Sequence, residues 1–418
     1  MSGAPTLETL YAAGNVVDQQ VRYRSLSDRL KGRTGSSGEV IFVSSPGRSE
    51  LGGNHTDHNH GHVLCASVQY DMVAAVQPRD DNRIELSSDG FDELFAVDLN
   101  SLERVPEEEG KTQALIRGMA AELAARGYAI GGFDAVVNST VPVGSGLSSS
   151  ASFEVLIGGI INALFNEGKI LPVLIAQVGQ IAENAYFGKP CGLMDQLACS
   201  AGGVLMIDFE DTREPKIHRI DVKFANREYA LVAVSTGGSH ADLTDAYASI
   251  PKEMKETAAA FGKTVLREVD EAEFPKKVME LRGKVGDRAI LRALHFFAED
   301  RRVSEMQKAL EGNDFEAFIE LVRASGLSSL GVLQNIIPPQ SDGHEQPVAL
   351  ALGASSLFFE RIGRGVARIS GGGFAGTIQA YVHRDDYDEY VTLMESYFGD
   401  GCVQPLTIRP YGVTRVQA

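Results

Sequence analysis

The segment VPVGSGLSSSAS (141–152) combines glycines and serines in a spacing that suits phosphate binding. It lies between a strand-like run and an amphipathic helical stripe over 153–164, so a helix N-terminus, with its unpaired N–H groups and positive dipole end, follows it directly. Gly144 and Gly146 let a phosphate approach the backbone, and the hydroxyls of 148–150 can bind phosphate oxygens or a metal ion. Simple helix capping by serine is the alternative. No lysine follows the glycines, which distinguishes the segment from the loop of P-loop enzymes.

A second glycine-rich segment, GGGFAG (371–376), matches the GxGxxG pattern of dinucleotide-binding folds. That pattern requires a strand before it and a helix after it. In the following residues, TIQAYV (377–382), the apolar residues Ile378, Ala380 and Val382 alternate with the other three. This period of two predicts a strand. The context therefore excludes a dinucleotide site, and a glycine hairpin is the simplest interpretation.

Histidines are concentrated in the segment PGRSELGGNHTDHNHGH (46–62). Four histidines and an aspartate lie close together in it: His55, Asp57, His58, His60 and His62. A zinc site is one hypothesis, and solvated histidines in a loop are the alternative. A third hypothesis is polyol binding, in which the aspartate accepts hydrogen bonds from neighbouring hydroxyls.

Two carboxylates lie in the segment ENAYFGKPCGLMDQ (183–196). Glu183 is near the end of a helical stretch, and Asp195 follows a turn that contains glycine. Lone carboxylates of this kind are usually surface charges. Here their neighbours are unusually apolar and rich in glycine, which favours a functional site.

These segments need strands and helices to position them. Strands are expected over 39–45, 67–76, 83–87, 94–99, 133–142, 203–208, 229–235 and 377–382. The first of these strands is expected to end at the Pro46-Gly47 turn. Helices are expected up to about residue 30, over 111–126 and 153–164, from Pro172 to about Phe187, and through most of 251–325.

Composition excludes several classes of protein. The chain has 418 residues, 44% hydrophobic and 23% charged, which is enough apolar material for a large core. Its 39 basic and 56 acidic residues give a net charge of −17 without an evident basic patch, so we expect no nucleic-acid partner. We find no apolar run as long as a membrane span and no secretory signal, so we expect no membrane partner. Four scattered cysteines favour a reduced, cytoplasmic environment.

Taken together, the four segments resemble the galactokinases, a branch of the kinases that phosphorylate galactose, homoserine, mevalonate and phosphomevalonate (GHMP kinases). PGRSELGGNHTDHNHGHVL is similar to the sugar-binding signature, and VPVGSGLSSSAS to the phosphate loop. ENAYFGKPCGLMDQ is similar to the segment that carries the catalytic aspartate, and ISGGGFAG to the C-terminal glycine motif. The motifs occur in the family's order, and the resemblance covers roughly residues 38–415.

The resemblance implies an α+β fold with two domains and an active site in the cleft between them. Residues 1–225 would form an N-terminal α/β domain like domain 2 of ribosomal protein S5, which binds sugar and phosphate. Residues 226–418 would form a ferredoxin-like α+β domain. The resemblance also implies ATP as co-substrate, Mg²⁺ as metal ion, and transfer of phosphate to the anomeric hydroxyl of a hexose.

The same resemblance implies roles for individual residues. Asp195 would be the catalytic carboxylate, with Arg48 as its partner across the attacking hydroxyl, and Ser150 and Glu183 would hold Mg²⁺. The residues expected to bind ATP and its phosphates are Gly144, Gly146, Ser148, Ser149, Ser150 and Gly372. The residues expected to contact the sugar are Asn54, His55, Asp57, Gly192 and Tyr247.

Three positions depart from the family pattern. Asn54 replaces a glutamate, His58 replaces a tyrosine, and the sequence 249–251 replaces a pair of arginines. Loss of the glutamate removes a charge that would repel a substrate carboxylate. Galactose is the expected substrate, and a related hexose or a hexuronic acid such as galacturonate is the alternative. A sugar- and ATP-binding regulator without turnover is a further alternative, and retention of Asp195 and Arg48 argues against it.

Overall fold

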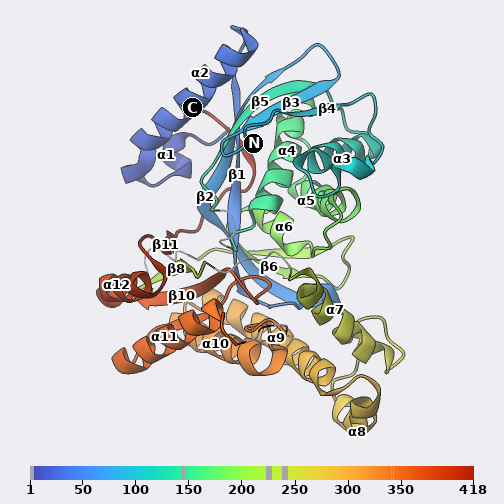
Figure 1. The fold of residues 1–418 in the computed structure, drawn as a ribbon, viewed down its shortest axis with the longest axis vertical. Coiled ribbons are helices and arrows are strands. Elements are labelled where there is room, and N and C mark those ends of the chain that lie inside the picture. The colour runs from blue at the N-terminus through green and yellow to red at the C-terminus, as the bar shows by residue number, and fades with distance from the viewer. Residues whose placement is uncertain (1–3, 143–145, 223–227, 238–242, 340, 342) are drawn as a thin grey trace.

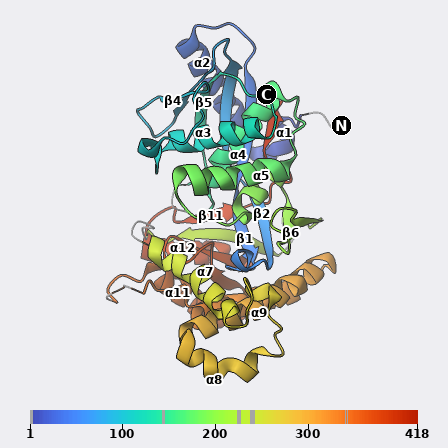
Figure 2. The same ribbon diagram turned by 90° about the vertical axis from the view of Figure 1, so that its right-hand side faces the viewer.

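The computed structural model describes residues 4–142, 146–222, 228–237, 243–339, 341 and 343–418. Within these ranges the strands form two sheets, which follow one another along the longest axis of the molecule (Figures 1 and 2). Helix α2 (Val16–Thr34) lies toward one end of that axis and α8 (Phe274–Lys284) at the other. Among the helices described, none is both long and apolar enough to cross a lipid bilayer.

The larger sheet contains eight strands within the described residues. Its main path is β12-β1-β2-β5-β3-β4, and β6 and β7 extend it from the first residues of β2. The pairing of β3 with β5 is parallel, whereas β1 pairs antiparallel with both of its neighbours. The strands are β1 (Ile41–Gly52), β2 (His62–Pro78), β3 (Arg83–Ser88), β4 (Phe95–Asp98), β5 (Phe133–Ser139), β6 (Val204–Asp208), β7 (Lys216–Ile220) and β12 (Thr414–Val416).

Strand β2 is apolar at every position from 72 to 76 because helices cover both of its faces. Val73 and Ala75 pack with the apolar side of α2, while Ala74 and Val76 belong to the core beneath α3 and α4. The helices around this sheet are α1 (Leu7–Leu10), α2, α3 (Thr112–Ala125), α4 (Ser149–Phe165), α5 (Pro172–Ile181) and α6 (Met194–Ala201).

The smaller sheet has the strand order β11-β8-β10-β9, and its pairings are antiparallel. Its strands are β8 (Tyr229–Ser235), β9 (Val366–Ile369), β10 (Thr377–His383) and β11 (Val403–Leu406). Helices connect β8 to β9 and β10 to β11, and this is the ferredoxin-like arrangement that was expected. These and neighbouring helices are α7 (Thr244–Ala259), α8, α9 (Asp287–Glu311), α10 (Phe315–Ser328), α11 (Pro347–Ile362) and α12 (Tyr387–Phe398).

Strand β10 confirms the alternation seen after the glycine motif. Ile378, Ala380 and Val382 pack in the core formed with α11 and α12, whereas Tyr381 packs on the opposite face against Phe318 of α10. The segment 371–376 joins β9 to β10, which pair antiparallel. The glycine motif is therefore a hairpin connection, as its context predicted.

The expected domain boundary near residue 225 lies in 223–227, outside the described residues. Strands before this segment belong to the larger sheet and those after it to the smaller one, except that β12 returns to pair with β1. Thr6 also forms a bridge with Gln417, so the two ends of the chain lie near each other on the larger sheet (Figure 1). The boundary at residue 225 stays a prediction.

Strand β1 continues through Pro46-Gly47 to Gly52, so the expectation that it ends at this turn is wrong. Its register with β2 shifts between Pro46 and Arg48, which is a β-bulge. Proline has no N–H to donate to a ladder, and a bulge lets the strand continue past it. The Arg48 N–H donates to the Leu147 carbonyl at 3.1 Å, so the bulge joins this strand to the phosphate-loop segment.

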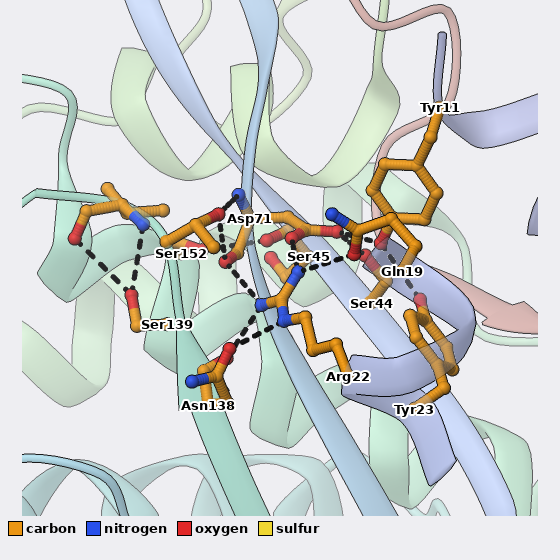
Figure 3. Close-up of polar contacts among 12 residues, drawn as sticks. Tyr11, Gln19, Arg22, Tyr23, Ser44, Ser45, Asp71, Asn138, Ser139 and Ser152 are labelled. Carbon is orange, nitrogen blue, oxygen red and sulfur yellow. Dashed lines mark hydrogen bonds and ion pairs between the residues drawn. The ribbon is translucent and has the colours of Figure 1, made fainter. Parts of the chain in front are cut away.

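A buried ion cluster around Asp71 anchors the ends of the chain to the larger sheet (Figure 3). We call Asp71, Tyr11, Arg22, Ser44 and Arg409 the Asp71 cluster. Its carboxylate accepts hydrogen bonds from Tyr11 Oη at 2.6 Å, Ser44 Oγ at 2.6 Å, Arg22 Nη1 at 2.7 Å and Arg409 Nη1 at 2.9 Å. Burial raises the pKa of Asp71, but the two arginines outweigh it and hold this pKa below its ordinary value.

Candidate active site

The structure brings Arg48 and Asp195 together as a bidentate ion pair. Arg48 follows the bulge of β1, and Asp195 lies in the first turn of α6. Arg48 Nε is 2.6 Å from Asp195 Oδ1, and Nη2 is 2.7 Å from Oδ2. The arginine side chain is 6% exposed and that of the aspartate 32%, so one side of the pair remains accessible.

Asp195 is held in its ionised form. Burial alone raises the pKa of this carboxyl, but the charge of Arg48 and the hydrogen bonds from Arg48 and Ser148 outweigh burial, and its pKa lies below the ordinary value. We call Asp195, Arg48 and Ser148 the Asp195 cluster. An ionised carboxylate with an accessible side can accept a proton from a bound hydroxyl.

The phosphate-loop segment contacts both members of this pair. The Gly146 carbonyl accepts a hydrogen bond from Arg48 Nη1, and the Ser148 hydroxyl donates to Asp195 Oδ2. Ser148 is the N-cap residue of α4, but its side chain makes no capping hydrogen bond. Helix capping therefore does not explain this serine. Gly144 lies outside the described residues.

Ser150 and Glu183 also meet, beside the start of α4. Ser150 Oγ donates to Glu183 Oε1 at 3.2 Å, and Lys189 Nζ lies 3.0 Å from the same oxygen. Gln196 Nε2 donates to Glu183 Oε2 at 3.0 Å. Ser149 is the first residue of α4. The serine hydroxyl and the carboxylate thus place two oxygen atoms of the kind that ligate metal ions side by side.

Glu154 is a fully buried carboxyl behind this group. Gln196 Nε2 donates to Glu154 Oε2 at 3.0 Å, and Glu154 Oε1 has no partner among the described atoms. Burial, and then the charge of Glu183, raise the pKa of Glu154 well above its ordinary value. Burial and the neighbouring carboxylate therefore both favour the neutral form of Glu154. Sequence analysis missed it, although a lone acidic residue within the apolar stripe of α4 was an available signal.

A cavity of about 120 Å³ opens beside the Arg48–Asp195 pair. It contains most of the residues expected to contact a sugar, and one expected to contact ATP, Gly372. Residues in its wall include Arg48, Glu50, Asn54, His55, Asp57, Gly192, Asp195, Gly371 and Gly372. The wall therefore combines the ion pair with a dense set of hydrogen-bonding groups.

Asp57 and Gly192 are in close contact across this cavity. A Cβ atom added to Gly192 would lie 1.9 Å from Asp57 Oδ2, so only glycine allows the carboxylate to occupy this position. The other oxygen, Asp57 Oδ1, accepts a hydrogen bond from the backbone N–H of His58 at 2.9 Å. Asp57 is thus held at the cavity wall by the close approach of two loops.

His55 and Tyr247 both contact the 371–376 glycine segment. His55 Nε2 donates to the Gly372 carbonyl at 2.8 Å, and burial, followed by the nearby His58, lowers the pKa of His55 to about 3. His55 is therefore neutral. Tyr247 Oη donates to the Gly373 carbonyl at 2.8 Å, so its hydroxyl bonds the glycine segment.

The histidines of 55–62 do not share one centre. His62 Nδ1 lies 3.0 Å from Asp300 Oδ1, whereas His55 bonds the glycine segment. Within the part of the chain that the structure describes, no group of three or more His, Cys, Asp or Glu side chains is arranged to hold a metal ion.

One further cavity residue, Glu50, was not singled out from the sequence, and neither was its buried partner Arg368. Arg368 Nη2 donates to Glu50 Oε1 at 2.7 Å, and Asn54 Nδ2 donates to the same oxygen at 3.1 Å. Burial raises the pKa of Glu50 to about 7, against the opposing charges of Arg368 and Arg48. Arg368 is 318 residues away in the chain, so only the fold shows this pairing.

Comparison with known proteins gives a consistent result. The profile of the GHMP kinases N terminal domain matches residues 114–203, and the galactokinase galactose-binding signature matches residues 31–78. Galactokinase of Streptomyces coelicolor is 32% identical over 377 residues, which are 90% of this chain and 92% of that protein. Galactokinase of Glaesserella parasuis is 32% identical over 347 residues, 82% of this chain and 85% of that protein.

Solved structures with the same fold include other members of the GHMP kinases. The crystal structure of Lactococcus lactis galactokinase complexed with galactose has a TM-score of 0.80 and 25% identity, and covers 94% of this chain and 99% of that one. Methanococcus jannaschii mevalonate kinase has a TM-score of 0.62 at 15% identity, over 89% of this chain and 99% of that one, which shows the likeness of fold alone.

Proposed function

The chain belongs to the galactokinases, and on that premise we propose that its cavity binds galactose and that the enzyme transfers the γ-phosphoryl group of ATP to the 1-hydroxyl of the sugar. The products are ADP and galactose 1-phosphate. The observation that carries the proposal is the Arg48–Asp195 pair, which faces the cavity on one side and contacts the phosphate-loop segment on the other.

Asp195 accepts the proton of the attacking hydroxyl, and Arg48 stabilises the negative charge that develops on the sugar oxygen. A new bond forms between this oxygen and phosphorus while the bond from phosphorus to the ADP oxygen breaks. Because Arg48 keeps Asp195 ionised, the carboxylate can accept the proton of the hydroxyl. The same ion pair lowers the pKa of Asp195 and so makes it a weaker base. Positioning of the hydroxyl is therefore as important as proton transfer.

ATP supplies the phosphoryl group when it is bound, and the residues next to Asp195 fit that role. Gly146 has a φ of 67°, which favours glycine, and α4 begins immediately after Ser148. The start of this helix supplies N–H groups and a positive dipole end for phosphate oxygens. We assign Gly144, Gly146, Ser148, Ser149 and Gly372 to ATP binding on the family resemblance, with the contacts of Gly146 and Ser148 in support.

Ser150 and Glu183 are suited to hold Mg²⁺ together with the phosphates of ATP. A carboxylate and a hydroxyl are hard oxygen donors, and Mg²⁺ in kinases takes one or two protein ligands in addition to phosphate. Their oxygens are 3.2 Å apart and lie at the N-terminal end of α4. Mg²⁺ would neutralise phosphate charge there, while Gln196 fixes the orientation of Glu183.

The alternative substrate, a hexuronic acid, was argued from the absence of an acidic group at residue 54. In the structure Glu50 lies in the same wall, 3.1 Å from Asn54, so the wall retains an acidic group. This removes the basis of that alternative. For the location of the protein, we keep the cytoplasmic prediction, and the four cysteines, which are unpaired in the structure, support it.

The experiment is an assay of ADP release from the purified chain with ATP, Mg²⁺ and a panel of galactose, glucose, mannose and galacturonate. We expect kcat/KM to be highest for galactose, with galactose 1-phosphate as product. Galactose binding without ADP release would instead identify a regulator that lacks turnover. Comparable turnover of galacturonate would show that the sugar assignment is wrong.

A further inference from the structure

The residues of the cavity wall differ in how much hydrogen-bonding capacity they have left for a sugar. A hexose that enters a buried cavity must exchange its bonds with water for bonds with the wall, because an unsatisfied buried hydroxyl is costly. The useful groups are those whose donors and acceptors are not already paired within the protein. Asn54 and Glu50 lie side by side in this wall and differ in this respect.

The amide of Asn54 is fully occupied by the protein. Its Nδ2 donates to the Gly371 carbonyl at 2.6 Å and to Glu50 Oε1 at 3.1 Å. Its Oδ1 accepts from Asn335 Nδ2 at 2.7 Å, and the whole residue is inaccessible to solvent. An amide has two donor hydrogens and one acceptor oxygen, so little capacity remains for a ligand. Asn54 therefore links Glu50 of β1 to the glycine segment through hydrogen bonds, and its amide has little capacity left to bind a sugar.

Glu50 has one oxygen committed and one with capacity left. Its Oε1 accepts from Arg368 and Asn54, and these two bonds fix the carboxyl group in place. Its other oxygen, Oε2, lies 3.4 Å from Asn54 Nδ2. At this length the hydrogen bond is weak. The side chain of Arg368 is inaccessible to solvent, whereas that of Glu50 is 4% exposed and belongs to a residue that lines the cavity.

We propose that Glu50 is a sugar-binding residue, whose Oε2 accepts a hydrogen bond from one hydroxyl of galactose and thereby selects the sugar. This inference rests on the proposed function and adds a residue to which no role was assigned from the sequence. Arg368 acts as a positioning residue, because it holds the carboxyl group of Glu50 against the wall. A sugar hydroxyl left without a partner in a buried cavity is costly, so loss of this bond is expected to be visible in substrate affinity.

The first test compares the wild type with Glu50→Gln on galactose and on its 2-, 3-, 4- and 6-deoxy derivatives. The glutamine keeps an oxygen for Arg368 and Asn54 but replaces the accepting Oε2 by an amide group that donates. We expect KM for galactose to rise about 10- to 100-fold, with kcat changed less than about threefold. For the one deoxy sugar that lacks the partner hydroxyl, the variant and the wild type should have the same kcat/KM. An equal loss on all five sugars would overturn the proposal.

The second test separates sugar binding from neutralisation of Arg368. The double variant Glu50→Gln/Arg368→Met removes both charges, so it leaves no unpaired arginine in the core. If Glu50 binds the sugar, KM stays high in the double variant even where its thermal stability recovers. Recovery of KM together with stability would show a purely structural role and overturn the proposal. Glu108→Gln, which removes an arginine-paired carboxylate that does not line the cavity, is the control, and its KM should match the wild type.

These experiments also distinguish failure of the inference from failure of the proposed function. Without galactose turnover in the wild type, the proposed function itself is wrong. With normal wild-type turnover and an unchanged KM in Glu50→Gln, only the role of Glu50 is wrong.

Discussion

The Asp71 cluster and the Asp195 cluster are built from the same parts but serve different purposes. Each places a carboxylate against the larger sheet and pairs it with arginine and serine. Asp71 accepts hydrogen bonds from four different residues, and its side chain is inaccessible. Asp195 has two partners, and 32% of its side chain is exposed toward the cavity.

This difference shows what separates an ion pair that stabilises the fold from one that takes part in catalysis. Arginine lowers the pKa of both carboxyls, so the ionisation state does not separate them. Only Asp195 has room for another donor, such as a substrate hydroxyl. Asp71 instead connects Arg22 of α2 and Ser44 of β1, as Figure 3 shows, and it also binds Arg409 of the C-terminal segment.

The largest effect is expected for Asp195→Ala, which removes the proton acceptor and the contact to the attacking hydroxyl. We expect kcat to fall by about 10²- to 10⁴-fold while galactose still binds. Asp195→Asn is the matched control for shape, because it keeps hydrogen-bonding atoms near Arg48 but lacks a basic carboxylate, and it should lose as much turnover. Steady-state kinetics and calorimetric sugar binding measure both. A variant with more than about a tenth of the wild-type kcat would contradict the catalytic role.

The Asp71 cluster should respond in stability rather than in turnover. Asp71→Asn leaves two buried arginines with one charge partner fewer, which costs about 3–5 kcal/mol of unfolding free energy. We expect kcat per folded molecule to stay within about twofold of the wild type at low temperature. Urea denaturation and an activity assay on the same sample test this. A loss of kcat like that of Asp195→Asn, with unchanged stability, would remove the distinction between the two clusters.

Ser150→Ala and Glu183→Ala should weaken Mg²⁺-dependent turnover and spare galactose binding. Each removes an oxygen donor, so we expect the Mg²⁺ concentration for half-maximal activity to rise about tenfold and saturating Mg²⁺ to restore part of kcat. Magnesium titrations of the initial rate measure this, with the dissociation constant of galactose as the internal control. Equal losses of galactose affinity and activity that do not respond to Mg²⁺ would instead indicate structural roles.

The smallest effect is expected for Glu154→Gln, in stability against pH. The folded-state pKa of Glu154 is raised, so folding takes up a proton, and wild-type stability falls as pH rises above about 4.5 toward the folded pKa. The glutamine side chain does not titrate, so we expect the stability of the variant relative to the wild type to increase as the pH rises from 5 to 8. Melting temperatures from pH 5 to 8 test this, and parallel curves for the two proteins would contradict it.

The order of the amino acids was enough to predict the available chemistry and the local elements that carry it. The spacing of glycine and serine before an apolar stripe predicted the start of α4, and the alternation of 377–382 predicted β10. These signals are local, because helix and strand periodicity depend on which face of a segment is buried. Four motifs in order were enough to indicate the family and the two-domain α+β fold.

The folded chain is needed to show which of these groups meet and which already have hydrogen-bond partners within the protein. Arg48 and Asp195 are 147 residues apart, and Asn54 and Asn335 are 281 apart, so no local pattern shows their contacts. The interpretation of Asn54 as a charge lost from the wall missed Glu50, which lies four residues earlier, in β1. Side-chain direction in this bulged strand depends on its register with β2. Residue type sets what a group can donate or accept, whereas burial and neighbours from distant segments set what capacity remains for a ligand.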